Sequence, residues 1–154
     1  MPVIIDGSSG ITFPNSTTQA SAGKVLQVVQ GTLSTSTSTT SSSYVTSGVT
    51  ATITPKFATS KIFILLSAQA RSDANKWLQT ALFKNGSYLN KINDGLHYVS
   101  GTTITTQLSY SFLDSPATTS ATTYALYFNA QAGGTVSINI DNAVATIILM
   151  EIAG

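Results

Sequence analysis

The chain has 154 residues, of which only 8% are charged, with seven basic and six acidic side chains, no cysteine and one histidine. Without cysteine it can form no disulfide framework or thiolate metal site, and one imidazole cannot build a histidine-rich site. A net charge of +1 is too small for a nucleic-acid-binding surface. Because 42% of the residues are apolar, the chain can still bury a core, under a surface of hydroxyls and amides.

Residues 1–23 differ in composition from the rest, because they hold too few apolar residues to form a core alone. We expect an extended N-terminal attachment arm over residues 1–23 and a β-sandwich head domain over residues 24–154. The first residues lack the basic and long apolar regions of a signal peptide, and no stretch of the chain is long enough for a membrane helix. The expected anchoring residues are Val3, Ile4, Ile5, Ile11, Phe13 and Pro14.

From residue 24 onward, apolar residues recur with a period of two, which predicts strands. Thr, Ser, Val, Ile and aromatic residues dominate, and branched side chains pack well on a pleated sheet. Two segments, Ile62–Leu66 and Ala143–Ile152, are apolar on both faces, which predicts central strands or strands covered by a neighbouring subunit. The alternating sets lie within residues 49–53, 62–70, 104–112, 124–128 and 136–140.

Turn residues separate these segments. Asn85-Gly86 predicts a hairpin between Trp77–Phe83 and Tyr88–Ile92, because both residues tolerate positive φ. Further turns are expected at residues 114–116, 132–134 and 141–142. The segment Thr32–Ser43 contains eleven Ser and Thr residues among twelve and is expected to be an exposed loop. Eight or nine strands at this spacing predict an all-β fold, a jelly-roll-like antiparallel β-sandwich of about eight strands. The periodicity does not give the strand order.

The sequence offers little material for catalysis. His97 is the one imidazole that could serve as a base, and its surroundings favour a surface or interface position. Four carboxylates, Asp73, Asp94, Asp114 and Asp141, fall in expected turns, where Asp caps its own backbone. We therefore expect no enzyme, no catalytic residue, no metal and no cofactor.

Three aromatic residues, Trp77, Tyr88 and Tyr98, lie near expected loops. Such side chains can stack on sugar rings, so they are candidates for a glycan or host contact. Packing in a core or against another subunit is the other interpretation of the same residues.

The segment Gly10–Ala20 resembles one that recurs in tail-fibre and other virion proteins of tailed phages, with the usual form Gly-Ile-x-Phe-Pro-Asp-Gly-Thr-x-Gln. This chain has Asn15 and Ser16 where Asp and Gly are usual. Lys24–Gln30 looks like the strand that follows this segment. Ile53-Thr54-Pro55 followed by Ser60-Lys61-Ile62, and the closing Ile147–Ala153, are similar to small structural proteins of marine and cyanobacterial phages.

The resemblance implies a non-enzymatic bacteriophage virion structural protein, assembled in the host cytoplasm and displayed on the virion surface as a homotrimer. The arm would hold it to capsid or tail proteins, either as a short fibre or appendage that contacts the host or as a capsid decoration protein. The alternative is a carbohydrate-binding β-sandwich module, a receptor-binding head that uses exposed aromatic residues on a host glycan. Neither reading calls for nucleic acid or membrane insertion.

Overall fold

The computed structural model describes residues 24–96, 101–131, 133–141 and 143–154 and, before residue 24, the backbone of three short strands. The regular structure in these residues is entirely β, and none of them belongs to a helix long and apolar enough to cross a membrane. The strands are β1 (Ile4–Asp6), β2 (Gly10–Thr12), β3 (Thr18–Gln19), β4 (Val25–Leu33), β5 (Thr37–Thr39), β6 (Val45–Ile53), β7 (Lys61–Ser72), β8 (Trp77–Lys84), β9 (Ser87–Leu96), β10 (Ile104–Asp114), β11 (Thr122–Gln131), β12 (Val136–Ile138) and β13 (Ala145–Ile152).

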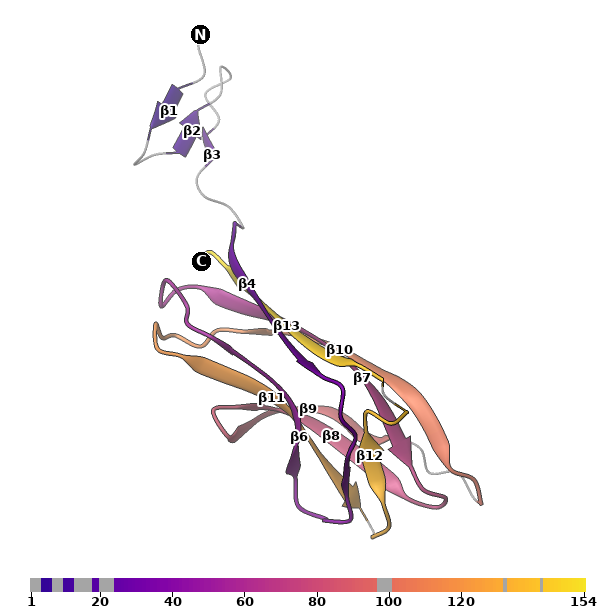
Figure 1. Cartoon of the computed structure of the whole chain (residues 1–154). Coiled ribbons are helices and arrows are strands. Elements are labelled where there is room, and N and C mark those ends of the chain that lie inside the picture. The colour runs from indigo at the N-terminus through magenta and orange to yellow at the C-terminus, as the bar shows by residue number, and fades with distance from the viewer. Residues whose placement is uncertain are drawn as a thin grey trace.

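Ten strands form two antiparallel sheets packed face to face (Figure 1). In the first, here the β7 sheet, β13 lies between β4 and β7, β10 pairs with the other edge of β7, and β12 and β5 extend the array. The second, here the β11 sheet, has the order β6-β11-β8-β9.

Two long strands of the β7 sheet are each interrupted once, one between β4 and β5 and the other between β12 and β13. The two interruptions lie side by side in the sheet. β4 pairs with β13 up to Leu33 opposite Ala145, and β5 resumes the pairing with β12. Asn139 bridges the gap: its backbone N–H donates to the Gln69 carbonyl at 2.8 Å, and its side-chain amide donates to the Leu33 carbonyl at 2.6 Å. β4 with β5, and β12 with β13, therefore act as single broken strands.

Counting each broken strand once gives eight strand positions. The first, eighth, third and sixth form the β7 sheet, and the second, seventh, fourth and fifth form the β11 sheet. This order is that of a jelly roll, in which two four-stranded sheets are connected as Greek keys. The predicted jelly-roll β-sandwich is confirmed, with a strand order that the sequence pattern had left open.

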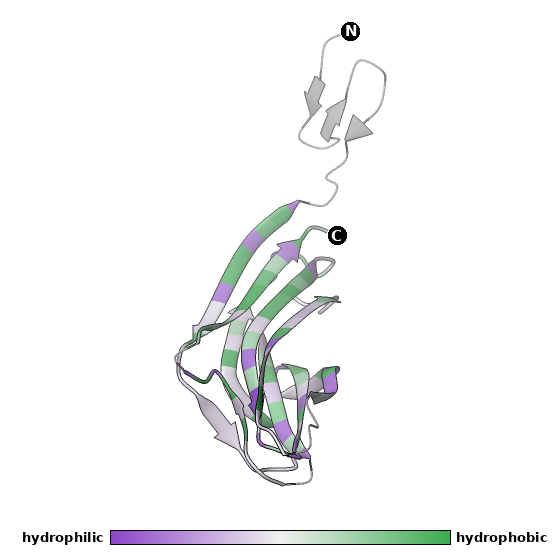
Figure 2. Cartoon of the chain, turned by 90° about the vertical axis from the view of Figure 1, so that its right-hand side faces the viewer, coloured by the Kyte–Doolittle hydropathy of each residue, from purple (hydrophilic) through white to green (hydrophobic). Residues whose placement is uncertain are grey.

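The core fills the space between the sheets and follows the predicted period of two. In β6, β7, β11 and β13, alternate side chains are buried while their neighbours face outward. The largest fully buried rings belong to Tyr124 and Phe128. β13 is a central strand, which is one of the two predicted alternatives, and in Figure 2 much of the strand that leads to the C-terminus is green, with a purple band near its end.

One side of the sandwich is closed by a close approach of β4 to β6. A Cβ atom on Gly31 would lie 1.9 Å from the Thr50 carbonyl oxygen, so only glycine fits at this crossing. The two sheets are therefore joined along this side by backbone contact.

The predicted hairpin turn and the predicted strand end at residue 114 are confirmed, whereas the turn expected at Asp94 is wrong, because this residue lies within β9. Asn85 and Gly86, with φ of 50° and 77°, connect β8 to β9 as the expected hairpin, and β10 ends at Asp114. The expectation that Thr32–Ser43 is a loop throughout is wrong, because β4 runs to Leu33 and Thr37–Thr39 forms β5. Backbone pairing with β12 makes this strand, and its polar residues show no apolar alternation.

In the N-terminal region, β2 pairs antiparallel with both β1 and β3, so the described backbone reverses direction twice. The side chains proposed for anchoring, Val3, Ile4, Ile5, Ile11, Phe13 and Pro14, lie outside the described residues. Attachment through residues 1–23 stays a prediction.

Candidate interaction surfaces

The outer face of the β7 sheet carries a line of apolar side chains across all four strands. Val28 lies opposite Met150, Met150 opposite Phe63, and Phe63 opposite Leu113. We call Val28, Met150, Phe63 and Leu113 the apolar row. Its outer members are strongly exposed, with 57% of Val28 and 47% of Leu113 accessible to solvent. The two-sided apolar character predicted for β7 and β13 is therefore real, and nothing in the described chain covers the second face.

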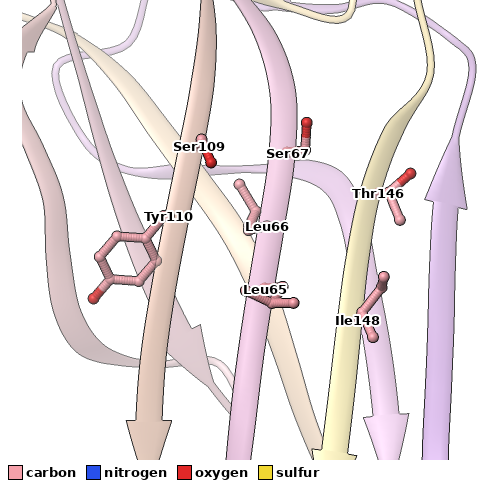
Figure 3. Close-up of a pocket in the computed structure, with 7 residues that line it drawn as sticks. All are labelled: Leu65, Leu66, Ser67, Ser109, Tyr110, Thr146 and Ile148. Carbon is pink, nitrogen blue, oxygen red and sulfur yellow. The ribbon is translucent and has the colours of Figure 1, made fainter.

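Beside the apolar row lies a shallow hollow of about 240 Å³. Leu65 and Ile148, which are direct neighbours across β7 and β13, form its apolar end, and Ser67, Ser109 and Thr146 form its polar end (Figure 3). The small hydroxyl residues leave a depression between larger side chains. A protruding side chain of another molecule could fill it, as in the packed centre of a protein interface.

Charge is nearly absent from this face. Along the outward positions of the described β4, β7, β10 and β13, the charged residues are Lys61 and Arg71, near opposite ends of β7. The face thus passes from an apolar part to a Ser- and Thr-rich part without a carboxylate. Such a surface attracts another uncharged surface more than a charged partner.

The outer face of the β11 sheet is aromatic instead. Phe83 and Tyr127 stack with ring centroids 3.9 Å apart, and Tyr44 and Tyr88 each meet Phe83 at 5.7 and 5.8 Å. We call Tyr44, Phe83, Tyr88 and Tyr127 the aromatic cluster. Tyr88 is the most open member, with 53% of its surface exposed. Burial, followed by the neighbouring Tyr88, raises the pKa of Tyr44, so its hydroxyl stays protonated.

Polar side chains continue this face along the β8–β9 hairpin. Lys91 Nζ lies 2.9 Å from Asp94 Oδ1, and Gln79 Nε2 donates to the same carboxylate at 2.7 Å. The hydrogen bond from Lys91, with its positive charge, lowers the pKa of Asp94, so the carboxylate remains an acceptor at neutral pH. Both charged groups are exposed and neutralise one another.

Of the three aromatic residues predicted for a host contact, the structure describes Tyr88 and Trp77, which lie far apart along the β8–β9 hairpin. Tyr88 belongs to the aromatic cluster, whereas Trp77 lies six residues from Phe83 along β8, a distance of about 20 Å. The Trp77 ring covers Gly95, where a Cβ would lie 2.3 Å from it, and 39% of this tryptophan is exposed. Tyr98, like His97, lies outside the described residues.

Sequence reasoning missed three members of the cluster. A usable signal existed: Phe83 and Tyr127 occupy the strand positions that alternate with the buried Leu82, Leu126 and Phe128. An aromatic residue at such a position has to face outward. Tyr44 lies immediately before β6, and nothing in the sequence indicated that its ring contacts Phe83 on β8 and Tyr88 on β9.

Two buried carboxylates, those of Asp114 and Glu151, hold separate strands together through hydrogen bonds. Asp114 accepts from the Tyr124 hydroxyl at 2.6 Å and from Lys84 Nζ at 3.0 Å, which ties β10 to the β11 sheet. Burial raises the pKa of Tyr124, and the adjacent Asp114 carboxylate raises it further. Among the described residues, no three carboxylate or imidazole side chains are grouped as metal ligands would be.

Glu151 is fully buried near the C-terminal end of β13. It accepts from Gln27 Nε2 at 2.6 Å and from the Lys56 N–H at 2.7 Å. Burial alone would raise the pKa of Glu151, but these bonds and one from the Phe57 N–H lower it overall. The carboxylate thereby joins β13 to β4 and to the turn before β7.

No family model matches the chain, and no curated protein matches it. Among solved structures, the chain is similar to a structure of T=1 particles derived from infectious bursal virus, with 11% identity and a TM-score of 0.47 over 83% of this chain and 38% of that one. It is also similar to a structure of the Gx strain of infectious bursal disease virus, with 10% identity and a TM-score of 0.49 over 99% of this chain and 44% of that one. The chain thus spans less than half of each of these proteins. With both TM-scores below 0.5, the fold assignment rests on the strand order alone.

Proposed function

We propose that this chain is a non-enzymatic structural protein of a virus particle, displayed on the particle surface as a homotrimer. The observation that carries the proposal is the apolar row on an otherwise uncharged outer sheet face. Jelly rolls occur in viral capsid domains, but also in lectins and cupins, so the fold alone does not decide the function. The resemblance of Gly10–Ala20 to a virion-protein segment supports the same role.

The occupant of the uncovered face is a second copy of this chain. Exposed apolar patches on folded domains mark sites of association. The face has an apolar part, a hydroxyl-rich remainder and no carboxylate among its described residues, which is the composition of a subunit interface. Only 8% of the chain is charged, so its own surface offers a matching neutral partner. Repeating the interface around a three-fold axis would give a closed homotrimer.

Residues 1–23 would then hold the trimer to the particle, with Val3, Ile4, Ile5, Ile11, Phe13 and Pro14 as anchors. A tailed-phage particle, as the sequence resemblance implies, offers two placements. A fibre or appendage would stand at a few positions and contact the host, whereas a decoration protein would cover the capsid. Labelling particles with an antibody against residues 24–154 separates them by the number and position of bound copies.

Light scattering tests the assembly. The full chain should have about three times the subunit mass of 16.0 kDa, and residues 24–154, which contain both sheets, should form the same trimer. Phe63→Asp places a charge in the centre of the apolar row and should yield monomers with unchanged circular dichroism. Thr105→Asp, at the polar end of the same sheet face, is the matched control and should remain trimeric. A monomeric full chain, or a trimeric Phe63→Asp variant, would refute the proposed interface.

A further inference from the structure

The aromatic cluster is a preassembled platform on the β11 sheet. Phe83 and Tyr127 form a stacked pair, and Tyr44 and Tyr88, whose ring centroids are 6.2 Å apart, each meet Phe83 edge-on. Ala81 is fully buried although its alternation with Leu82 places it on this outer face. The rings therefore cover the sheet beneath them, and they form a firm surface whose exposed part consists largely of tyrosine. Tyrosine offers an apolar ring and a hydroxyl at one contact point.

Hydrogen-bonding groups lie directly beside the platform. Lys91 is opposite Ala81, and Asp94 reaches Gln79 on the neighbouring strand. The amide, the ammonium and the carboxylate supply both donors and acceptors. Their charges cancel within the Lys91–Asp94 pair, so the surface has no excess charge with which to select an ionic ligand.

We propose that this surface, from Tyr88 along β8 and β9 to Trp77, binds a neutral oligosaccharide. Sugar rings have an apolar C–H face that can lie on a tyrosine or tryptophan ring, and a rim of hydroxyls that both donate and accept hydrogen bonds. The platform offers the first kind of contact and the Gln79–Asp94–Lys91 group the second. A nucleic acid would need several free cations, whereas the one lysine of the β8–β9 part of this surface is already paired.

The arrangement favours a chain of sugars over a single one. Tyr88 and Trp77 lie near opposite ends of the β8–β9 hairpin, about 20 Å apart, with the polar group between them. An extended ligand could stack at both ends and bind the polar group with its middle residues. The site lies on the opposite sheet from the apolar row, so it does not depend on the proposed virion role.

Saturation-transfer NMR and calorimetry on the full chain test this site, with cellohexaose, maltohexaose and chitohexaose as probes. At least one hexaose should bind. Tyr88→Ala should weaken that binding by about fivefold, since one aromatic contact contributes about 1 kcal/mol, and Tyr88→Phe, which keeps the ring, should weaken it less. Phe57→Ala removes an aromatic residue of similar exposure in the β6–β7 turn and should leave affinity within about twofold.

Two results would overturn the proposal. One is failure of all three hexaoses to bind, or equal binding by the wild type and Tyr88→Ala. The other is a change of mass in light scattering with Tyr88→Ala, which would assign the surface to a protein contact. Loss of the trimer in Phe63→Asp tests the other sheet, so the failure of one proposal is distinguishable from failure of the other.

Discussion

The outer faces of the two sheets differ in side chains and in edge geometry. The β7 sheet exposes aliphatic and hydroxyl side chains, and its edge strand β10 pairs with β7 without a break in register. The β11 sheet exposes aromatic rings and an ion pair, and its edge strand β9 shows three register shifts against β8. Bulges at an edge oppose strand addition by another chain. The comparison suggests that one face is suited to extended packing and the other to a defined ligand.

The largest change in stability is expected on β13, where substitutions on the buried face and on the outward face should have different effects. Ile147 is fully buried and its neighbour Ile148 faces outward on β13. Ile147→Ala should lower the free energy of unfolding by about 4 kcal/mol, because it removes buried methyl groups and leaves a cavity. Ile148→Ala should act on association, so its effect on the urea midpoint should shrink as the protein is diluted. Equal, concentration-independent losses in both variants would mean that the outer face is not an interface.

The contact between the sheets can be broken at Gly31. Gly31→Ala should destabilise the protein by about 3 kcal/mol, because the new methyl group meets the Thr50 carbonyl and β4 has to move away from β6. Gly86→Ala is the control, because a Cβ atom there would meet no other atom. The φ of 77° is unfavourable for alanine and should lower the free energy of unfolding by only about 1 kcal/mol. Chemical denaturation of both variants measures the difference. Similar losses would argue against a close approach at Gly31.

Glu151 should make stability depend on pH. Its pKa is lower in the folded protein than in the unfolded chain, so its contribution is complete above the unfolded value of about 4.3 and is lost as the pH falls through the folded value. In Glu151→Gln the melting temperature should fall less steeply below that pH. The same variant should lower the free energy of unfolding at pH 7 by about 2 kcal/mol. Asp141→Asn, at an exposed position, serves as the comparison. A wild-type pH profile in the Glu151→Gln variant would contradict this role.

The smallest effect is expected where β10 meets the β11 sheet. Tyr124→Phe removes the hydroxyl that donates to Asp114 and should cost about 1 kcal/mol, since Lys84 still contacts that carboxylate. Thermal unfolding measures the change, with Tyr88→Phe as a control for loss of an exposed hydroxyl. A loss above about 3 kcal/mol would indicate that the hydroxyl matters more than a single hydrogen bond does.

The inner faces of the sheets were predictable because burial imposes a period of two. Ile62, Ile64 and Leu66, and likewise Tyr124, Leu126 and Phe128, alternate and are buried. The jelly-roll order was not predictable in the same way, because alternation is equal for every arrangement of the same strands. β5 was missed because backbone bonds to β12 make it a strand, without any apolar side chain.

The candidate surfaces, too, could be predicted from the sequence only in part. The two-sided strands β7 and β13 indicated an uncovered face, but Val28 and Leu113 join the apolar row only through strand pairing. Trp77 and Tyr88 were selected for lying near loops, and the fold separates them. Tyr44 and Tyr127 meet on Phe83 through contacts between distant segments, which no local pattern encodes.

The hydrogen bond between Gln27 and Glu151 joins positions 124 residues apart. β13 therefore reaches its central place between β4 and β7 only after distant parts of the chain meet. Topologies dominated by such pairings fold in roughly milliseconds to seconds, because the entropy of closing a long loop is lost before the contacts form. Throughout that time the edges of β4 and β7 and the apolar row are open to other chains. Production of this protein should thus depend on low temperature or chaperones more strongly than its final stability would suggest.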